Sequence, residues 1–425
     1  MTGEVARKPD AVLERPAAPE APPQEAVRRL RPPIEISTDL SGKLGQTLDA
    51  DVLGALMDGC IEIDASDLHM TVGQNPVYRR HGRFHELVGY RPFTHDDLMM
   101  AVQFLIGEET GDNPYWARFR EHGGCDIGRE YEKKARFRVS VFQQRQHPAI
   151  ALRLIPYEML SFEQLGLSPE HIKQLLHRPR GVILLTGPTG CGKTTTIASM
   201  INYINEERDC HIISVEDPIE YYHESKKSII NQREVGVDVS SFAECVVRNM
   251  RSDPDVMLVG EMRDLETMRA CLQAAETGHL VFSTLHTVSA PKTVDRLVTA
   301  FPAIEQDEIR AMTSTSLAAV ISEELIPRID KDGRIAAFEI MMGEPAGSAA
   351  VGNLIRERKV SQMRTAIQSA SALGMQLLES HLAKLVRNGN ISFEEAFNRS
   401  NEKNDFMNFV GDEYVPQEYR RQIMD

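Results

Sequence analysis

The sequence predicts an α/β protein: a domain with a mainly parallel sheet, preceded by a smaller α+β domain. Four short apolar runs, GVILLT, HIISVE, VMLVG and LVFSTL, alternate with stretches of helical spacing between residues 181 and 345. Such alternation is typical of parallel strands that are buried on both faces. A glycine-rich loop follows the first run directly, and upstream of it arginine-studded strands accompany two helical segments.

Size and charge restrict the class of protein. At 425 residues the chain is long enough for two or three domains. A net charge of −14 and a pI near 5.5 argue against broad binding to nucleic acid or anionic membranes. No apolar run approaches the roughly 20 residues that span a bilayer, and the N-terminus lacks the apolar region of a secretory signal. We therefore expect a cytoplasmic protein without membrane insertion.

The first part of the chain divides into two segments. Residues 1–44 are expected to be a disordered extension, because seven of the 22 prolines fall within the first 40 residues. Residues 45–157 are expected to form the small α+β domain, with helices near 49–63 and 94–106, the second capped by Thr94. Its strands are expected in four segments: 66–72, 76–84, 134–146 and 149–156.

The remaining chain is expected to contain four segments. Residues 158–180 form a linker region that leads into the α/β domain at 181–345. Residues 346–400 are predicted to be helical, since leucines recur there at helical spacing before a glycine stop. The polar tail at 401–425 carries no pattern that assigns a role.

The stretch GPTGCGKTTT predicts a nucleotide site with Mg²⁺. It fits the G-x-x-x-x-G-K-T pattern in full and lies between an apolar strand and a helix, the context that the motif requires. Backbone N–H groups and the helix N-terminus would face the phosphates, Lys193 would reach the β and γ phosphates, and the Thr194 hydroxyl would bind Mg²⁺. The expected nucleotide contacts are Gly187, Pro188, Thr189, Gly190, Cys191, Gly192, Lys193, Thr194 and Thr195. Cys191 could be a redox switch or a tolerated small side chain.

Acidic residues follow the next strands, at the sheet edge where ligands bind. HIISVE ends in Glu216, with Glu220 shortly after it, and VMLVG is followed by Glu261. Hydrolysis needs a carboxylate that orients or deprotonates water, and Glu261 and Glu220 are the candidates. Gly260 stands where many phosphate-loop enzymes carry a magnesium-binding aspartate. Thr194, Glu216 and Glu220 are therefore the expected metal ligands, although each carboxylate could instead cap a helix or lie in a solvated loop.

Two histidines bracket the strand LVFSTL, His279 at its beginning and His286 at its end. Further metal ligands are not apparent beside them in the sequence. A phosphate or interface sensor is therefore one interpretation, and a packed structural histidine is the other.

Four stretches together resemble a known family. GPTGCGKTTT, VEDPIEYYH, SDPDVMLVGEMRDLET and AAETGHLVFSTLHT are similar, in order and spacing, to the phosphate loop, aspartate box, Walker B and histidine box of secretion-superfamily ATPases. Within that superfamily the chain is most similar to the PilT-like type IV pilus retraction ATPases, from about Ala55 to Phe397. The resemblance implies a RecA-like ATPase domain behind a PAS-like N-terminal domain, and a homohexameric ring that hydrolyses ATP.

The same resemblance implies roles for individual residues. Glu261 matches the Walker B glutamate, Glu220 the catalytic glutamate of the aspartate box, and His279 and His286 the histidine box. In the family, arginines of the N-terminal domain reach the nucleotide, and planar guanidinium groups suit phosphate clamping. The corresponding residues here are Arg136, Arg138 and Arg153, with surface ion pairing as the alternative for each.

The direction of pilus movement is indicated by three features. Assembly and type II secretion relatives typically carry a tetracysteine motif, whereas the six cysteines here form no C-x-x-C pair. GEMRD and the signature-like AVGNLIRERK also favour retraction, although Gly352 replaces an arginine of that signature. The expected function is twitching motility at the inner-membrane pilus base, with a membrane platform protein as partner. A PilU-like accessory, an assembly ATPase, a nucleic-acid translocase and a silent nucleotide-binding regulator are the alternatives.

Overall fold

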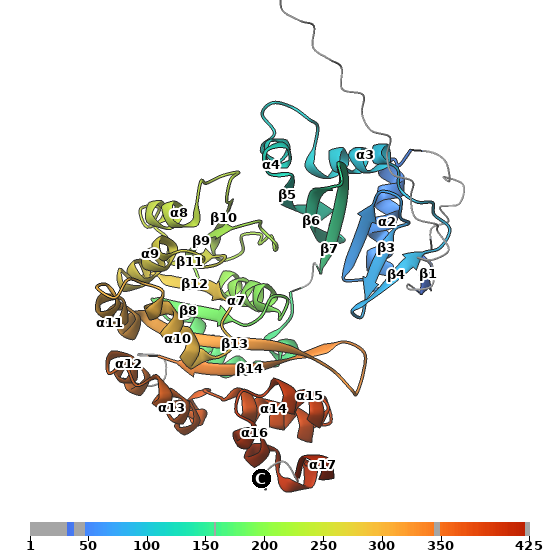
Figure 1. Ribbon diagram of the computed structural model, residues 1–425. Coiled ribbons are helices and arrows are strands. Elements are labelled where there is room, and N and C mark those ends of the chain that lie inside the picture. Colours follow the sequence, from blue (N-terminus) through green and yellow to red (C-terminus); the bar gives the residue numbers. More distant parts are fainter. Residues whose placement is uncertain (1–31, 38–46, 157–158, 344–348, 421–425) are drawn as a thin grey trace, which may run out of the picture.

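The computed structural model describes residues 32–37, 47–156, 159–343 and 349–420. Two bodies follow one another along the chain, each built on a seven-stranded sheet (Figure 1). The elements of the N-terminal body are β1 (Pro33–Ile34), α2 (Ala50–Glu62), β2 (Asp67–Thr71), β3 (Val77–Arg80), β4 (Arg83–Leu87), α3 (His95–Ile106), α4 (Pro114–His122), β5 (Gly124–Tyr131), β6 (Ala135–Gln144) and β7 (His147–Pro156).

The N-terminal sheet has the order β1-β4-β3-β2-β7-β6-β5 and is antiparallel except for β1, which lies parallel to β4. Asp49 caps α2, and Thr94 forms a capping box with Asp97 at the start of α3, as the sequence predicts. One part of the expected disordered extension is wrong, because Pro33 and Ile34 pair with Glu86 and Leu87. Residues 1–31 and 38–46 lie outside the described residues.

The second body carries the α/β sheet. Its elements are α5 (Phe162–Leu165), α6 (Pro169–Leu176), β8 (Gly181–Thr186), α7 (Lys193–Glu207), β9 (His211–Glu216), β10 (Ile229–Glu234), α8 (Phe242–Asn249), β11 (Val256–Val259), α9 (Leu265–Glu276), β12 (Leu280–Leu285), α10 (Ala290–Thr299), α11 (Gln306–Ser316), β13 (Leu317–Pro327) and β14 (Arg334–Met342). The four apolar runs of the sequence are β8, β9, β11 and β12, and all residues of β8, β11 and β12 are buried.

The order of this sheet is β10-β9-β11-β12-β8-β13-β14. All of its pairings are parallel except that between β13 and β14. The predicted mainly parallel sheet is thus confirmed, with an antiparallel hairpin added at one edge. Because β8, β9, β11 and β12 run in the same direction, the segments that follow them meet at one edge of the sheet.

Helices of the C-terminal region pack beyond β14 (Figure 1). They are α12 (Ala349–Arg356), α13 (Met363–Ser369), α14 (Leu378–Arg387), α15 (Phe393–Arg399), α16 (Lys403–Val410) and α17 (Gln417–Arg420). The described part of the polar tail from residue 401 contains a packed helix, for which the sequence carried no clear pattern. Phe406 and Val410 of α16 are fully buried against Leu382 and Ile326, so two apolar residues one helical turn apart anchor a short helix in an otherwise polar segment.

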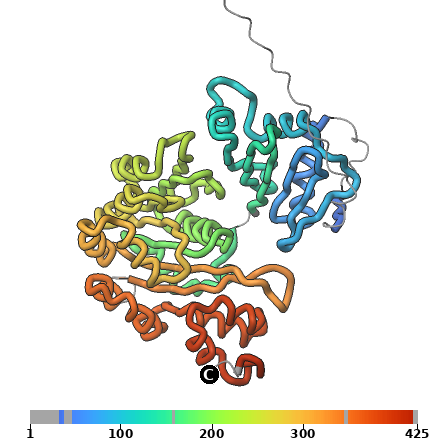
Figure 2. Tube along the Cα trace, in the orientation of Figure 1, coloured from blue at the N-terminus to red at the C-terminus, as the bar shows by residue number. Residues whose placement is uncertain are grey.

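The linker region contains α5 and α6, whose Ile172, Leu175 and Leu176 join the core of the α/β body. The N-terminal body contacts the α/β body through side chains of α4, and Figure 2 traces the backbone of the two bodies. The Tyr115 hydroxyl donates to Glu234 at 3.3 Å, and Arg118 donates to the Val235 carbonyl at 2.7 Å. Among the described residues, no helix is long and apolar enough to cross a membrane.

Candidate nucleotide site and family

The glycine-rich loop connects β8 to α7 in a conformation that glycine permits. Gly187 has φ 139° and Gly192 has φ 113°, values that L side chains rarely adopt. Added Cβ atoms would also collide, at Gly187 with the Glu323 carbonyl oxygen and at Gly192 with Glu323 Oε1. The loop therefore packs closely on β13, and α7 begins at Lys193 with its N–H groups turned toward the loop.

Lys193 is buried within this loop. Its ammonium donates to the Gly187 carbonyl at 2.8 Å and to the Pro188 carbonyl at 3.0 Å. These neutral acceptors can be exchanged for phosphate oxygens, which form stronger charge-assisted bonds. Thr194 lies exposed in the first turn of α7, and Thr195 contacts the Tyr221 hydroxyl at 3.0 Å. Burial raises the pKa of the Cys191 thiol, which disfavours the reactive thiolate and so a redox role.

Glu216 and Glu220 differ in their surroundings. Glu216 accepts hydrogen bonds from Ser214 at 2.6 Å and Gln232 at 3.2 Å, and its burial raises its pKa to about 7. Glu220 is more accessible and accepts from Arg138 Nη1 at 2.8 Å. Glu216 is thus held inside the protein, while Glu220 lies at the boundary with the N-terminal body.

Glu261 follows β11 and lies between two basic groups. Arg263 Nη2 lies 2.5 Å from Glu261 Oε1, and His286 Nε2 lies 3.7 Å from Glu261 Oε2. Burial acts to raise the pKa of Glu261, but Arg263 and His286 outweigh it and the pKa is lowered. Glu261 is therefore a carboxylate at neutral pH, as an acceptor of protons from water must be.

His279 lies away from this group. It precedes β12, where Leu280 pairs with Gly181, whereas the phosphate loop follows Thr186 at the other end of β8. Six strand residues separate the two ends, roughly 20 Å at the usual rise of a strand. The His279 ring Nδ1 contacts the Ala274 carbonyl at 2.8 Å instead. Within one chain the structure brings only His286 of this pair to the candidate site.

The three arginines that were expected to reach the nucleotide also lie in different places. Arg138 reaches Glu220, and Arg136 lies over the Tyr222 ring, 3.2 Å from its centroid. Arg136 is only 3% exposed, and its guanidinium makes no hydrogen bond within the described residues. Arg153 instead donates to Asp67 at 3.0 Å within its own sheet. Arg136 and Arg138 thus face the aspartate-box segment, and Arg153 forms the surface ion pair that was its alternative.

Three residues at the site were not predicted from the sequence. Arg263 was detectable, because it lies two residues after Glu261 in GEMRD. Tyr222 was detectable only as an aromatic residue inside the aspartate-box stretch. Glu323 lies on β13 with its side chain beneath the phosphate loop, and no motif marks it.

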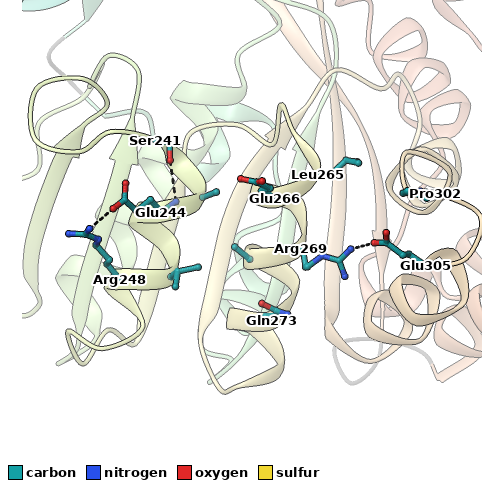
Figure 3. Close-up of a pocket in the computed structure, with 12 residues that line it drawn as sticks. Ser241, Glu244, Arg248, Leu265, Glu266, Arg269, Gln273, Pro302 and Glu305 are labelled. Atoms are coloured by element: carbon teal, nitrogen blue, oxygen red, sulfur yellow. Dashed lines mark hydrogen bonds and ion pairs between the residues drawn. The ribbon is translucent and has the colours of Figure 1, made fainter.

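A surface hollow lies away from the phosphate loop (Figure 3). It has a volume of about 620 Å³ and is bounded by α8, α9 and the segment from Pro302 to Glu305. Two ion pairs lie along it, Arg248 with Glu244 and Arg269 with Glu305. None of the predicted site residues lines it.

The model of the family described as "Type II/IV secretion system protein" matches residues 53–409. The chain belongs to this family. The type IV pilus retraction ATPase PilT of Pseudomonas aeruginosa is 46% identical over 332 residues, which cover 78% of this chain and 93% of that protein. The type IV pilus ATPase PilU of the same organism is 34% identical over 345 residues, covering 81% and 87%.

A crystal structure of the pilus retraction motor PilT with bound ADP has the same fold. It superposes with a TM-score of 0.74 at 41% identity and covers 83% of this chain and 98% of that one. The predicted PilT-like family and the RecA-like domain behind a smaller N-terminal domain are thus confirmed. Membership of this family implies ATPase activity.

Proposed function

We propose that this chain is an ATP-hydrolysing motor that powers type IV pilus retraction. The observation that carries the proposal is the relation to the P. aeruginosa retraction ATPase, at 46% identity over 93% of that protein's length. The relation to PilU is weaker, at 34% identity, which favours a principal motor over a PilU-like accessory. A homohexameric ring, working on a platform protein at the inner-membrane pilus base, is part of the same proposal.

In this proposal the loop from Gly187 to Thr195 binds the phosphates of ATP, and Lys193 exchanges its two carbonyl contacts for phosphate oxygens. The residues fit such a ligand, because an ammonium, a helix N-terminus and an exposed Thr194 hydroxyl converge at one end of β8. Among the described residues, no group of three or more His, Cys, Asp or Glu side chains could hold a metal ion. Mg²⁺ would therefore depend on Thr194, Glu220, phosphate oxygens and water, with buried Glu216 orienting its neighbours rather than ligating.

Hydrolysis is assigned to the carboxylates near the loop. Glu261, ionised beside Arg263, orients and deprotonates the attacking water, and His286 responds to the charge of the γ-phosphate. Mg²⁺, when bound, neutralises charge that develops on the transferred phosphoryl group. Glu220 contributes a second carboxylate at the boundary between the two bodies.

The arginines link the chemistry to movement. Arg136 is buried without a hydrogen-bond partner within the described residues, and such a cation is stabilised when an anion arrives. Arg138 can move from Glu220 to a phosphate oxygen, which draws the N-terminal body over the nucleotide and releases Glu220. Successive closure and opening around a ring would convert hydrolysis into rotation of the platform protein.

A cell-based experiment tests the proposed function. The native copy is replaced by the wild-type gene or by Lys193→Ala, and twitching zones are compared. We expect Lys193→Ala to abolish twitching while the protein accumulates normally, because the loop loses its charge-assisted bonds to phosphate. Twitching at the wild-type level would contradict the proposal. Hydrolysis stimulated by added DNA, with steep salt dependence, would instead support the nucleic-acid translocase.

A further inference from the structure

β13 forms the floor of the phosphate loop. It lies parallel to β8, and the Ser322 and Thr186 hydroxyl groups are 2.7 Å apart in the buried sheet. The next residue, Glu323, is only 3% exposed. A carboxyl group so deeply buried is rare in proteins unless its oxygens have partners, and the contacts of Glu323 are those of the loop.

Glu323 touches both ends of the loop and the helix that follows it. Its Oε2 accepts a hydrogen bond of 2.9 Å from Thr196 Oγ1, and Thr196 is fully buried in the first turn of α7. Its Oε1 fills the space where a Cβ at Gly192 would lie, and its backbone oxygen does the same at Gly187. A single residue thus supports the beginning of the loop, its end and the start of α7.

Burial raises the pKa of Glu323 to about 7, although Thr196 and Lys193 act in the opposite direction. The neutral acid is therefore substantially populated near neutral pH and adds little repulsion toward a phosphate. A glutamine would have nearly the same shape and could still accept from Thr196 through its amide oxygen. This pair of side chains provides a matched test of packing against charge.

We propose that Glu323 is a positioning residue for nucleotide binding, which holds the phosphate loop and the first turn of α7 in register through Thr196 and Gly192. The inference rests on the proposed function in taking an adenine nucleotide as the ligand. Glu323 acts on binding rather than on hydrolysis, because the candidate catalytic carboxylates Glu220 and Glu261 follow other strands, β9 and β11.

The test is equilibrium titration of the purified full chain with fluorescent mant-ADP. Glu323→Ala is expected to raise Kd about tenfold, since it leaves a buried hydroxyl without its acceptor and opens space beneath the loop. Glu323→Gln should keep Kd within about twofold of the wild-type value because the hydrogen bond survives. In steady-state hydrolysis, Glu323→Ala should raise KM for ATP by a similar factor while kcat changes less than about twofold.

Thr196→Val removes the same hydrogen bond from the other side without changing the side-chain shape, so it covers the case in which Glu323→Ala does not fold. It should also raise Kd, and combining it with Glu323→Ala should add little, because both changes remove one interaction. A Kd at the wild-type value in folded Glu323→Ala or in Thr196→Val would overturn the inference. Wild-type protein that fails to bind mant-ADP would instead overturn the proposed function.

Discussion

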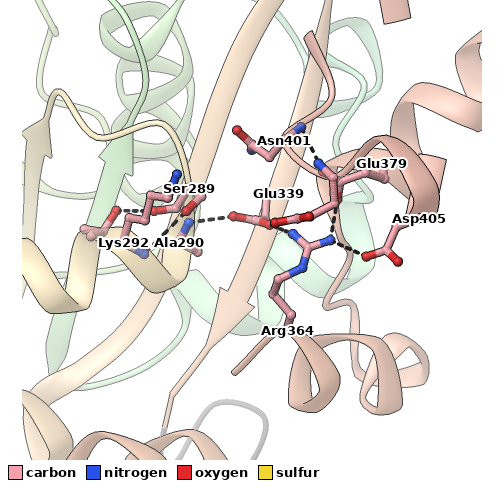
Figure 4. Close-up of polar contacts among 10 residues, drawn as sticks. Ser289, Ala290, Lys292, Glu339, Arg364, Glu379, Asn401 and Asp405 are labelled. Carbon is pink, nitrogen blue, oxygen red and sulfur yellow. Dashed lines mark hydrogen bonds and ion pairs between the residues drawn. The ribbon is translucent and has the colours of Figure 1, made fainter. Parts of the chain in front are cut away.

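A partly buried ionic cluster joins the α/β body to the C-terminal helices, and its single arginine offers a stringent test of the packing (Figure 4). Arg364 Nη2 lies 3.0 Å from Glu379 and 2.7 Å from Asp405, and its Nη1 lies 3.8 Å from Glu339. Glu339 and Glu379 are fully buried. Glu339 also accepts from the Ala290 N–H at 2.6 Å, so the cluster fixes the start of α10.

Arg364→Met removes the guanidinium while keeping most of the side-chain volume. Breaking a buried ion pair from one side costs about 3–5 kcal/mol, because the remaining charge has no compensation. For a unit of this size such a loss corresponds to a fall in Tm on the order of 10 °C. Burial already raises the pKa of Glu339 to about 7, and the nearby Glu379 carboxylate acts in the same direction.

The pH dependence follows from that shift. A carboxyl whose folded-state pKa is raised above its unfolded value stabilises the fold below the unfolded pKa and loses that contribution as pH rises through the folded pKa. Without Arg364 the pKa of Glu339 rises further, so the loss of stability in Arg364→Met should be larger at pH 8 than at pH 5.5. Thermal unfolding followed by circular dichroism at both pH values measures the difference.

A matched control is available on the surface. Arg358 pairs with Asp307, and both side chains are largely exposed, at 64% and 73%. Arg358→Met should therefore cost less than about 1 kcal/mol at either pH. The double variant Arg364→Met with Glu339→Gln should recover part of the stability, since it removes one of the two buried acids. Equal melting temperatures for the two arginine variants at pH 8 would refute this account of the cluster.

Three further predictions concern the nucleotide site. Arg138→Ala should lower the rate of ATP hydrolysis about tenfold or more, because a charge-assisted contact to phosphate is lost, while Arg153→Ala should leave the rate within about twofold of wild type; equal effects would contradict the assignment. Gly192→Ala should abolish binding of mant-ADP, since a Cβ would collide with a buried carboxyl at φ 113°; retained affinity would show that the loop adapts. His286→Ala should reduce hydrolysis more than His279→Ala, and the reverse order in a phosphate-release assay would mean that His279 reaches a site from another subunit.

The strands that position the site could be predicted from the sequence. β8, β11 and β12 are buried on both faces, so each reads as a continuous apolar run with clear ends. The phosphate loop, Glu216, Glu220 and Glu261 could be placed at one sheet edge from that pattern alone. The helix cap at Thr94 could be predicted because capping is an interaction between residues close in sequence.

The features that could not be predicted from the sequence depend on contacts between residues far apart in the chain. The strand β13 was not predicted, because its sequence VISEELIP contains acidic residues. Its buried Glu323 is hydrogen-bonded to Thr196, which lies more than 100 residues earlier in the chain. His279 and His286 were grouped because both match the histidine box of the family, and that match does not show that the strand between them separates the two rings. Similarly, α16 is stabilised by tertiary contacts of Phe406 and Val410, and these contacts could not be predicted from its mostly polar sequence.

The central claim, that this ATPase withdraws pili, is tested most directly by counting surface pili in cells whose own copy carries Glu261→Gln. Removing the carboxylate should leave ATP binding intact and slow hydrolysis by about a hundredfold or more, as is usual for loss of a general base. The account predicts more surface pili together with lost twitching, because pili still extend but are not withdrawn. Fewer pili, or none, would contradict it and would make the chain an assembly or secretion ATPase.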